Sequence, residues 1–350
     1  IKNLFIAGTR PEIIKISPLV NVLSSQVLLT GQHFKKEMLD DFLPLINPSK
    51  LINLELDEFK DFHTHRYLIS NLIKDKILEL DINNVFVLGD TNTTLVGAIA
   101  AKSAKKKLFF IESGLRTEDL NQIEEYNRLI VSHLADINFC NHENNVNNLI
   151  NEGISDNKIK LTGSTVFSAL DGLGLSEPSE GESDYILLTL HRPENVDNEE
   201  RLRSLIVGLK KLNFKIIFPI HPRTKDKITK MENINTEHIE IIEPKNYDDF
   251  VNLIKSSKLI ISDSGGLQEE AMILRKPLLI PRKYTERPEM LNIFNLLTYE
   301  ISEILENASN IIENKSTLLK TISEHKYLYG ENEVISNFVS FLDQDKIWEK

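Results

Sequence analysis

The sequence has 350 residues, of which 41% are hydrophobic and 27% charged, and its formal net charge is −11. A chain of this size exceeds the range in which one core keeps growing, so we expect two globular domains. The acidic balance argues against non-specific binding to nucleic acid or to an anionic membrane. No apolar run approaches the ~18 residues of a membrane helix, so we expect no membrane partner.

Cys140 is the single cysteine, which excludes an intrachain disulfide and is typical of a reducing compartment. It ends an apolar stretch, so a buried structural thiol is favoured over a nucleophile. The chain begins directly with an apolar strand and shows no signal-peptide pattern, and we therefore expect a cytoplasmic protein.

Short apolar runs alternate with helical patterns along the chain. Helices are expected from near Pro11, over Thr94–Ala104 and over Val334–Trp348. Continuous apolar strands are typical of parallel sheets buried on both faces, and the alternation predicts open α/β sheets. The expected strands are Leu4–Ala7, Val85–Leu88, Leu108–Ile111, Ile186–Leu190, Lys215–Phe218, Ile239–Ile242, Leu259–Ile261 and Leu278–Ile280.

A break between two halves is predicted at Ser176–Ser183, which is rich in Ser, Glu, Pro and Gly and has no apolar pattern. This predicts a first α/β domain at 1–175, a second at 176–333 and an amphipathic closing helix at 334–350. Two such halves would place a cleft between the carboxyl ends of both sheets, where open sheets bind ligands.

A glycine turn in the second half predicts an anion site. Ser264, Gly265 and Gly266 follow an apolar strand and precede a helix, whose first amides have no internal partner and attract anions. The segment matches neither GxxxxGK[ST] nor GxGxxG, and close strand–helix packing explains the small residues equally well.

Two cations follow the first strand of the chain. Arg10 and Lys15 flank Pro11, which suits a first helical position, and both can point at an anion in the cleft. Arg is suited to forked phosphate contacts. A solvated pair at a helix start is the alternative.

Three carboxylates lie at or near strand ends in the first half. Asp90 either caps the next helix or faces the cleft. Glu112 ends a strand and either faces the cleft or pairs with Arg116. Glu124 stands four residues before Arg128, as in a surface helix pair. Clustered carboxylates raise one another's pKa, which suits acid/base exchange near neutral pH.

Two histidines follow strands in the second half. His191 leaves its strand beside Arg192, close to the expected phosphate position, and His221 repeats the arrangement one strand later. Neither belongs to a cluster with metal-ligand spacing, so no metal is predicted. The sequence has no GxSxG and no Cys–His signature, so nucleophilic hydrolysis lacks support.

Taken in order, these motifs resemble those of the non-hydrolysing UDP-N-acetylglucosamine 2-epimerases. The resemblance implies two Rossmann-like parallel-sheet α/β domains of the glycosyltransferase-B type, with a UDP-sugar in the interdomain cleft, and a homodimer. The matching segments run in register from residue 4 to about residue 290: Gly8–Glu12, Thr30–His33, Gly89–Thr91, Glu112–Thr117, Glu124–Arg128, Thr162–Thr165, His191–Asn195, Asp263–Glu270 and Thr285–Glu289.

The same resemblance implies a reaction. UDP-GlcNAc would be inverted reversibly at C2 to UDP-ManNAc without an added cofactor, by elimination of UDP to a 2-acetamidoglucal and its re-addition. The product would serve cell-surface polysaccharide or glycan precursor synthesis. Such chemistry needs a positioned base, an opposed acid and stabilisation of the departing diphosphate.

The resemblance also implies roles for particular residues. The catalytic set would be Asp90, Glu112, Glu124 and His191, with the face served by each carboxylate left open. Arg10, His191, Ser264, Gly265 and Gly266 would hold the diphosphate, Glu270 the ribose hydroxyls and Phe250 the uracil, while Lys15 and Arg128 would balance charge near the sugar and phosphates.

The sequence departs from the family pattern in places. Ile123 replaces a common Pro, and Ser113 and Ser164 replace a common Ala and Asn. No Gln occurs in Asn47–Ser70, where bacterial members use one to bind a second, activating UDP-GlcNAc, although Gln32 and His33 are present.

Other interpretations stay open. A hydrolysing relative would release ManNAc and UDP and would share most motifs. A glycosyltransferase on the same fold would share the site at Ser264–Gly266, and a non-catalytic UDP-sugar-binding module would need no carboxylates. The intact Asp90, Glu112 and Glu124 favour the epimerase over these last two. The sugar is either UDP-GlcNAc or a modified derivative, such as a 3-acetamido uronate.

Overall fold

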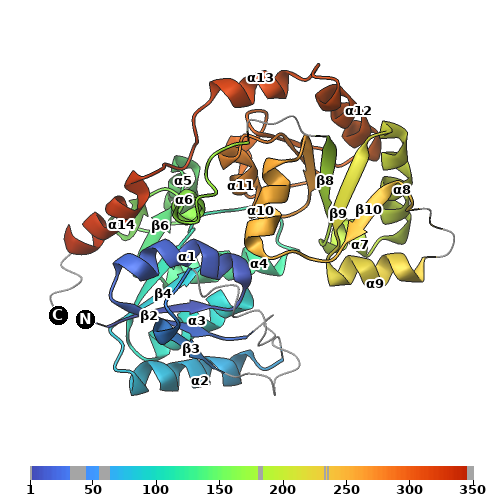
Figure 1. The fold of residues 1–350 in the computed structure, drawn as a ribbon. Helices are drawn as coiled ribbons and strands as arrows, with labels where there is room; N and C mark the ends of the chain where they lie inside the picture. Colours follow the sequence, from blue (N-terminus) through green and yellow to red (C-terminus); the bar gives the residue numbers. More distant parts are fainter. Residues whose placement is uncertain are drawn as a thin grey trace. The chain divides into compact units, whose positions relative to one another are not determined.

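The computed structural model describes residues 2–31, 45–54, 64–179, 184–231, 234 and 236–344 (Figure 1). The chain divides into two compact units, one formed by Ile1–Gly172 with Leu328–Lys350 and the other by Leu173–Tyr327. Each unit is built on one parallel sheet with helices on both faces, the arrangement that the alternating pattern predicts. Among the described residues, no helix has the length and apolar content needed to cross a membrane.

The described strands of the first unit form a seven-stranded parallel sheet in the order β3-β2-β1-β4-β5-β6-β7. The order reverses between β1 and β4, and such a switch point is where open α/β sheets bind ligands, beyond the carboxyl ends of the strands. The strands are β1 (Asn3–Ala7), β2 (Ser25–Leu29), β3 (Leu51–Asn53), β4 (Asn84–Leu88), β5 (Lys107–Ile111), β6 (Ile137–Cys140) and β7 (Ile159–Leu161).

Helices cover both faces of this sheet. On one face, the apolar residues of three helices pack against every second side chain of the strands. These helices are α2 (Arg66–Glu79), α3 (Asn92–Ser103) and α4 (Ile123–Leu134). The other face is covered by α1 (Arg10–Val22) and α14 (Glu333–Gln344). Two further helices, α5 (Glu143–Asn151) and α6 (Val166–Gly172), complete the unit.

The last helix returns to the first unit because its apolar stripe completes that core. Val334, Phe338 and Leu342 recur at helical spacing and are fully buried. The ring of Phe338 lies 4.6 Å from that of Phe139 on β6. The incoming chain is fixed by a hydrogen bond from the Ser164 amide to a backbone carbonyl, 2.9 Å long, at Tyr329.

The second unit has a six-stranded parallel sheet among its described residues, in the order β10-β9-β8-β11-β12-β13. Here the switch point lies between β8 and β11. The strands are β8 (Tyr185–Thr189), β9 (Lys215–Pro219), β10 (Ile239–Ile242), β11 (Leu259–Ser262), β12 (Leu278–Ile280) and β13 (Asn295–Leu297). The helices are α7 (Pro193–Val196), α8 (Glu199–Leu209), α9 (Pro222–Lys230), α10 (Tyr247–Lys255), α11 (Leu267–Ile273), α12 (Ile301–Ile312) and α13 (Thr317–Glu324).

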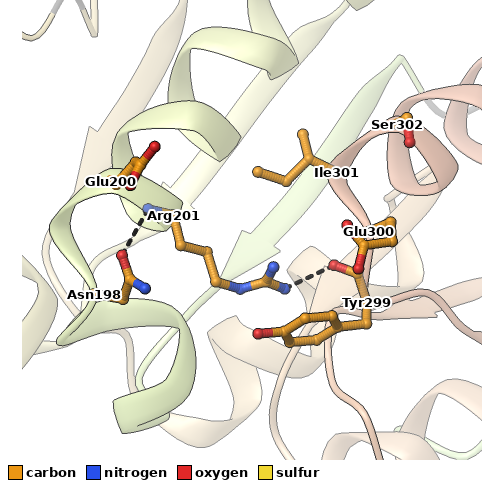
Figure 2. Close-up of a pocket in the computed structure, with 7 residues that line it drawn as sticks. All are labelled: Asn198, Glu200, Arg201, Tyr299, Glu300, Ile301 and Ser302. Atoms are coloured by element: carbon orange, nitrogen blue, oxygen red, sulfur yellow. Dashed lines mark hydrogen bonds between the residues drawn. The ribbon is translucent and has the colours of Figure 1, made fainter.

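One arginine joins the starts of α8 and α12 in this unit. The Arg201 guanidinium lies 3.8 Å over the ring of Tyr299 and donates a 2.8 Å hydrogen bond to that residue's backbone carbonyl (Figure 2). A planar cation stacked on an aromatic ring and hydrogen-bonded at its edge is held in one orientation. The surrounding pocket is lined by Asn198, Glu200, Arg201, Tyr299, Glu300, Ile301 and Ser302.

Candidate active site

One buried carboxyl group connects the two loops at the switch point of the first sheet. Glu12 on α1 accepts hydrogen bonds from the amides of Gly8, at 2.7 Å, and Thr9, at 3.0 Å. Its second oxygen accepts a 2.6 Å hydrogen bond from the Thr91 hydroxyl, in the loop after β4. Glu12 therefore ties the loop that carries Arg10 to the loop that carries Asp90.

The environment of Glu12 disfavours its charge. Burial raises the pKa of this carboxyl from its ordinary 4.5 to about 7, even though the hydrogen bonds from Thr91, Gly8 and Thr9 act in the opposite direction. The nearby charge of Asp90 raises the pKa further. The sequence marked Glu12 as part of a motif, but gave it no role in the site.

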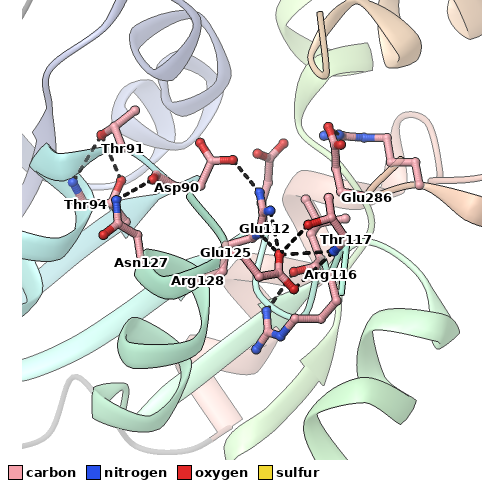
Figure 3. A network of polar contacts seen from close by, with 12 residues as sticks. Asp90, Thr91, Thr94, Glu112, Arg116, Thr117, Glu125, Asn127, Arg128 and Glu286 are labelled. Atoms are coloured by element: carbon pink, nitrogen blue, oxygen red, sulfur yellow. Dashed lines mark hydrogen bonds and ion pairs between the residues drawn. The ribbon is translucent and has the colours of Figure 1, made fainter. Parts of the chain in front are cut away.

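Asp90 is held by α4. The cap of α3 is Thr91, whose hydroxyl accepts from the Thr94 amide, so the capping alternative for Asp90 is wrong. Instead Arg128 donates from Nη1 to the Asp90 carboxylate at 2.5 Å, and Asn127 donates to the Asp90 backbone carbonyl at 2.8 Å (Figure 3). Asp90 keeps 34% of its side chain exposed, so the paired carboxylate remains open to a ligand.

Arg128 has a second acidic partner. Its Nη2 and Nε donate to Glu125 at 2.7 and 3.1 Å, and Glu125 also accepts from the amide and hydroxyl of Thr117 (Figure 3). Burial alone would raise the pKa of Glu125, but Arg128 and Thr117 outweigh it and lower the pKa. The sequence singled out Glu124, which lies half-buried in the first turn of α4, and missed Glu125, whose i,i+3 spacing from Arg128 was the available signal.

Glu112 pairs with a residue distant in sequence. The Lys15 ammonium on α1 donates to its carboxylate at 2.6 Å, and both side chains are buried. Arg116, the neighbour considered as a partner in the sequence, forms a two-pronged ion pair with Glu152. The backbone of Glu112 has φ +61°, a left-handed conformation that is costly for a residue with a Cβ and is common at functional sites.

Asp90 and Glu112 leave neighbouring strands. Because Leu88 on β4 is in register with Ile111 on β5, both carboxylates follow at the same edge of the sheet. Each forms an ion pair with a buried cation, Lys15 or Arg128, which fixes its position. Two positioned carboxylates at one edge are suited to removing and delivering protons.

The glycine turn of the second unit follows β11. A Cβ added to Gly265 would collide with the carboxylate of Glu286, which is itself bound by Arg282 and Arg287. A Cβ added to Gly266 would meet no atom of the described segments within 4 Å, and its φ of −65° is open to any residue. Packing among the described residues thus explains why position 265 has no side chain, but it does not explain the glycine at position 266.

His191 follows β8, on the opposite side of this switch point. Its Nδ1 lies 3.1 Å from the carboxylate of Asp263, a fully buried residue after β11 that the sequence did not single out. The ring of His221 lies 5.7 Å from that of His191, so the structure brings the two strand-end histidines together.

Polar and aromatic groups of α10 and α11 meet beside the glycine turn. The Tyr247 hydroxyl donates to the Glu270 carboxylate at 2.9 Å, and Phe250 lies one turn further along α10, half-buried. Tyr247 was missed in the sequence, although its i,i+3 spacing from Phe250 places both on one face of the helix. Gln32, His33 and residues 55–63 lie outside the described residues, so the expectation about a second activating site stays a prediction.

Comparison with known proteins gives consistent matches. A family model described as UDP-N-acetylglucosamine 2-epimerase matches residues 20–343. The chain is 38% identical to the UDP-N-acetylglucosamine 2-epimerase of Methanocaldococcus jannaschii over 342 residues, covering 90% of this chain and 93% of that protein. It is 32% identical to the UDP-2,3-diacetamido-2,3-dideoxy-D-glucuronate 2-epimerase of Pseudomonas aeruginosa over 364 residues, covering 97% and 99%.

The fold is also similar to solved structures. A crystal structure of the Methanocaldococcus jannaschii UDP-GlcNAc 2-epimerase in complex with UDP-GlcNAc and UDP matches with a TM-score of 0.82 and 33% identity in the structural alignment. The match covers 98% of this chain and 100% of that chain. Together with the two all-parallel sheets, it confirms the predicted pair of α/β domains of the glycosyltransferase-B type.

The raised pKa of Glu12 gives a testable dependence of stability on pH. Because its folded pKa is about 7 and its ordinary value 4.5, its contribution to folding is full below about pH 4.5 and is lost as the pH rises from there through 7. Glu12→Gln keeps an acceptor for Gly8 and Thr9 but never ionises. We expect the variant to gain stability relative to the wild type between pH 5 and 8.5, by up to roughly 3 kcal/mol.

Urea denaturation across this pH range measures the difference in free energy of unfolding. The exposed Glu143→Gln gives the baseline for removing one acidic side chain from the same unit. A Glu12→Gln difference that is equal at pH 5 and pH 8.5 would show that the buried carboxyl does not ionise in this range.

Proposed function

The chain belongs to the UDP-N-acetylglucosamine 2-epimerase family and is an epimerase, and from this premise we propose that it interconverts UDP-GlcNAc and UDP-ManNAc. The observation that carries the proposal is the pair Asp90 and Glu112, which leave adjacent strands and are each bound to a buried cation. An inversion at carbon needs a group that removes a proton and another that returns one, and two such carboxylates meet that need.

The reaction that we propose proceeds by elimination and addition. A carboxylate takes the C2 proton as the C1–O bond breaks, and the bonding pair leaves with the diphosphate oxygen of UDP, giving 2-acetamidoglucal. A protonated group then delivers a proton to the opposite face of C2 while the same diphosphate oxygen reforms the bond to C1. Asp90, Glu112 and Glu124 are the proposed acid/base groups, and no added cofactor enters the balance.

The cationic partners support this assignment in physical terms. Lys15 fixes Glu112 from α1, and Arg128 fixes Asp90 from α4, so the carboxylates are held by side chains that are themselves buried. Catalytic groups work best when a surrounding shell fixes their position. The left-handed backbone of Glu112 is a further sign of a position held for its chemistry.

We propose that the second unit binds UDP. Its supporting features are the half-exposed His191, the unoccupied space over Gly266 and the Tyr247–Glu270 contact beside Phe250. A small residue with free space above it lets a phosphate approach the backbone amides. Glu270 would accept ribose hydroxyls, Phe250 would stack on uracil, and Arg10 would add charge to the diphosphate.

A second candidate substrate has specific support. The Pseudomonas aeruginosa relative, 32% identical over nearly the whole chain, is named for a diacetamido uronate sugar. The acid/base chemistry at C2 would be the same, and the two substrates differ in groups at C3 and C6. The alternative proposal is therefore 2-epimerisation of such a modified UDP-sugar.

Incubation with UDP-GlcNAc in deuterated water, followed by NMR of the sugar, tests the function. We expect UDP-ManNAc that carries deuterium at C2, and deuterium also in the recovered UDP-GlcNAc. Free ManNAc would identify a hydrolysing enzyme, and turnover of the diacetamido uronate alone would identify the modified substrate. Unlabelled and unchanged sugar with both substrates would overturn the epimerase proposal.

Glu112→Gln tests the acid/base assignment. The amide keeps the size of the side chain but cannot exchange a proton, so deuterium incorporation should fall by about 100-fold or more. UDP affinity, measured by calorimetry, should stay near the wild-type value because Glu112 is not among the proposed UDP ligands. Retained exchange would remove Glu112 from the acid/base set.

The two glycines of the turn make a matched pair. Gly266→Ala should fold normally, since free space surrounds that position, but should weaken UDP binding and let UDP and the glucal escape during turnover. Gly265→Ala should lower the melting temperature instead, because its methyl group meets Glu286. A Gly266→Ala variant that loses all activity without releasing glucal would contradict the proposal that this turn retains UDP during turnover.

We also propose a homodimer, formed through an exposed apolar face. The neighbouring helices α2, α3 and α4 expose Tyr67, Ile99, Tyr126 and Ile130 on the side away from the sheet. Clustered exposed apolar residues of this kind mark interaction surfaces.

Light scattering should give twice the 40.1 kDa chain mass for the wild type, and Ile99→Glu should halve the measured mass. Val207→Glu, at an exposed valine on α8 in the second unit, is the control. A monomeric wild type would contradict the proposal.

A further inference from the structure

Asp263 is a buried carboxylate with an unusual set of donors. It follows β11, is completely inaccessible to solvent and lies across the switch point from His191. Its oxygens accept from the amide of His191 at 3.1 and 3.2 Å and from the amide of Arg192 at 3.0 Å. The side-chain amide of Asn195 donates at 3.0 Å, and Nδ1 of His191 lies 3.1 Å away.

These contacts keep Asp263 ionised. Burial by itself would raise the pKa of this carboxyl, but His191, Asn195 and the Arg192 amide outweigh burial and lower the pKa. A carboxylate only accepts hydrogen bonds, so a ring nitrogen that bonds to it must carry the proton. Nδ1 of His191 is therefore the protonated nitrogen, and Nε2 is the one left for another partner.

The same carboxylate fixes both the ring and the backbone of His191. Since the amides of His191 and Arg192 bind it as well, the backbone that carries the ring is fixed relative to the carboxylate that accepts from Nδ1. The His191 side chain is 35% exposed while Asp263 is wholly buried, so one edge of the ring faces inward and another reaches solvent. With Nδ1 engaged by Asp263, Nε2 is the ring nitrogen left to meet a ligand.

We propose that Asp263 is a positioning residue: it accepts a hydrogen bond from Nδ1–H of His191, which leaves Nε2 as the nitrogen that takes up a proton and donates to an oxygen of the bound diphosphate. The proposal rests on the UDP-binding function proposed above for the second unit. In the imidazolium form Nε2 would donate a charge-assisted hydrogen bond to the leaving diphosphate, and the Asp263 carboxylate would stabilise that cation.

A relay of two contacts, from Arg201 to Asn195 and from Asn195 to Asp263, holds the carboxylate in place. Asn195 is fully buried and donates to Asp263, while its carbonyl oxygen accepts a 2.8 Å hydrogen bond from Nε of Arg201. Because Arg201 can only donate, the amide of Asn195 has one possible orientation. The stacking of Arg201 on Tyr299 holds the far end of this relay (Figure 2).

Nitrogen-15 NMR of the full chain with labelled histidine tests the tautomer directly. The spectrum is recorded at a pH where the ring is neutral, and the His191 signals are identified by their loss in His191→Gln. We expect a protonated Nδ1 and an unprotonated Nε2, whose resonance shifts when UDP is added. A protonated Nε2 in the wild type would overturn the proposal, as would an Nε2 resonance that UDP leaves unmoved at saturation.

Asp263→Asn gives the second measurement. We expect the ring to move to the Nε2–H tautomer and the Kd for UDP to rise about tenfold, because a neutral ring then donates to the diphosphate and its hydrogen bond is no longer charge-assisted. The control His221→Gln alters the neighbouring ring and should leave the His191 tautomer unchanged. An unchanged tautomer and Kd in Asp263→Asn would overturn the proposal, and the wild-type spectrum decides if this variant does not fold.

Failure of UDP binding and failure of the positioning role of Asp263 give different results. If the wild type did not bind UDP at all, the proposed function would be wrong, while an Nδ1–H ring in that sample would still support the assignment to Asp263. If UDP bound and the ring carried its proton on Nε2, the function would stand and the positioning role would be wrong.

Discussion

A buried carboxylate needs hydrogen-bond donors, and this need shapes both switch points of the molecule. Glu12 accepts two amides of the loop after β1 and a hydroxyl of the loop after β4. Asp263, after β11, accepts two amides and two side chains of the segment after β8. In each sheet one carboxyl group thus joins the two loops at the point where the strand order reverses.

The two carboxyl groups differ in charge for a physical reason. Asp263 has a histidine ring beside it, which lowers its pKa. The donors to Glu12 within the described part of the chain are neutral and Asp90 adds a neighbouring charge, so burial dominates and the pKa of Glu12 is raised. The pKa of Glu12 therefore lies near neutral pH. The cations Lys15 and Arg128 form ion pairs with Glu112 and Asp90, the carboxylates at the strand ends. Charge is placed where the proposed chemistry needs it.

The sequence predicted β1, β4, β5, β8, β9, β10, β11 and β12 and the residues that follow them, because both are local patterns. It did not identify β2 or β6, which contain polar residues within or before a short apolar run. It also missed β3, β7 and β13, which are three residues long and mix polar with apolar side chains. It also could not choose partners for charged groups. Glu112 has a local candidate in Arg116, yet the fold supplies Lys15 from 97 residues away. Glu124 and Glu125 both have helical spacing to Arg128, and only the packing of α4 shows Glu125 as the buried one.

The glycine turn shows how packing and function can be separated within one motif. The sequence offers Gly265 and Gly266 as equivalent, since a phosphate site and a tight strand–helix turn both call for small residues. The carboxylate of Glu286 accounts for Gly265, whereas no contact among the described residues accounts for Gly266. In an elimination that must be reversed, the leaving group has to stay close to the carbon that it left. A turn open at Gly266, with the ring of His191 fixed across the same switch point, is a place where a diphosphate would be held through that interval.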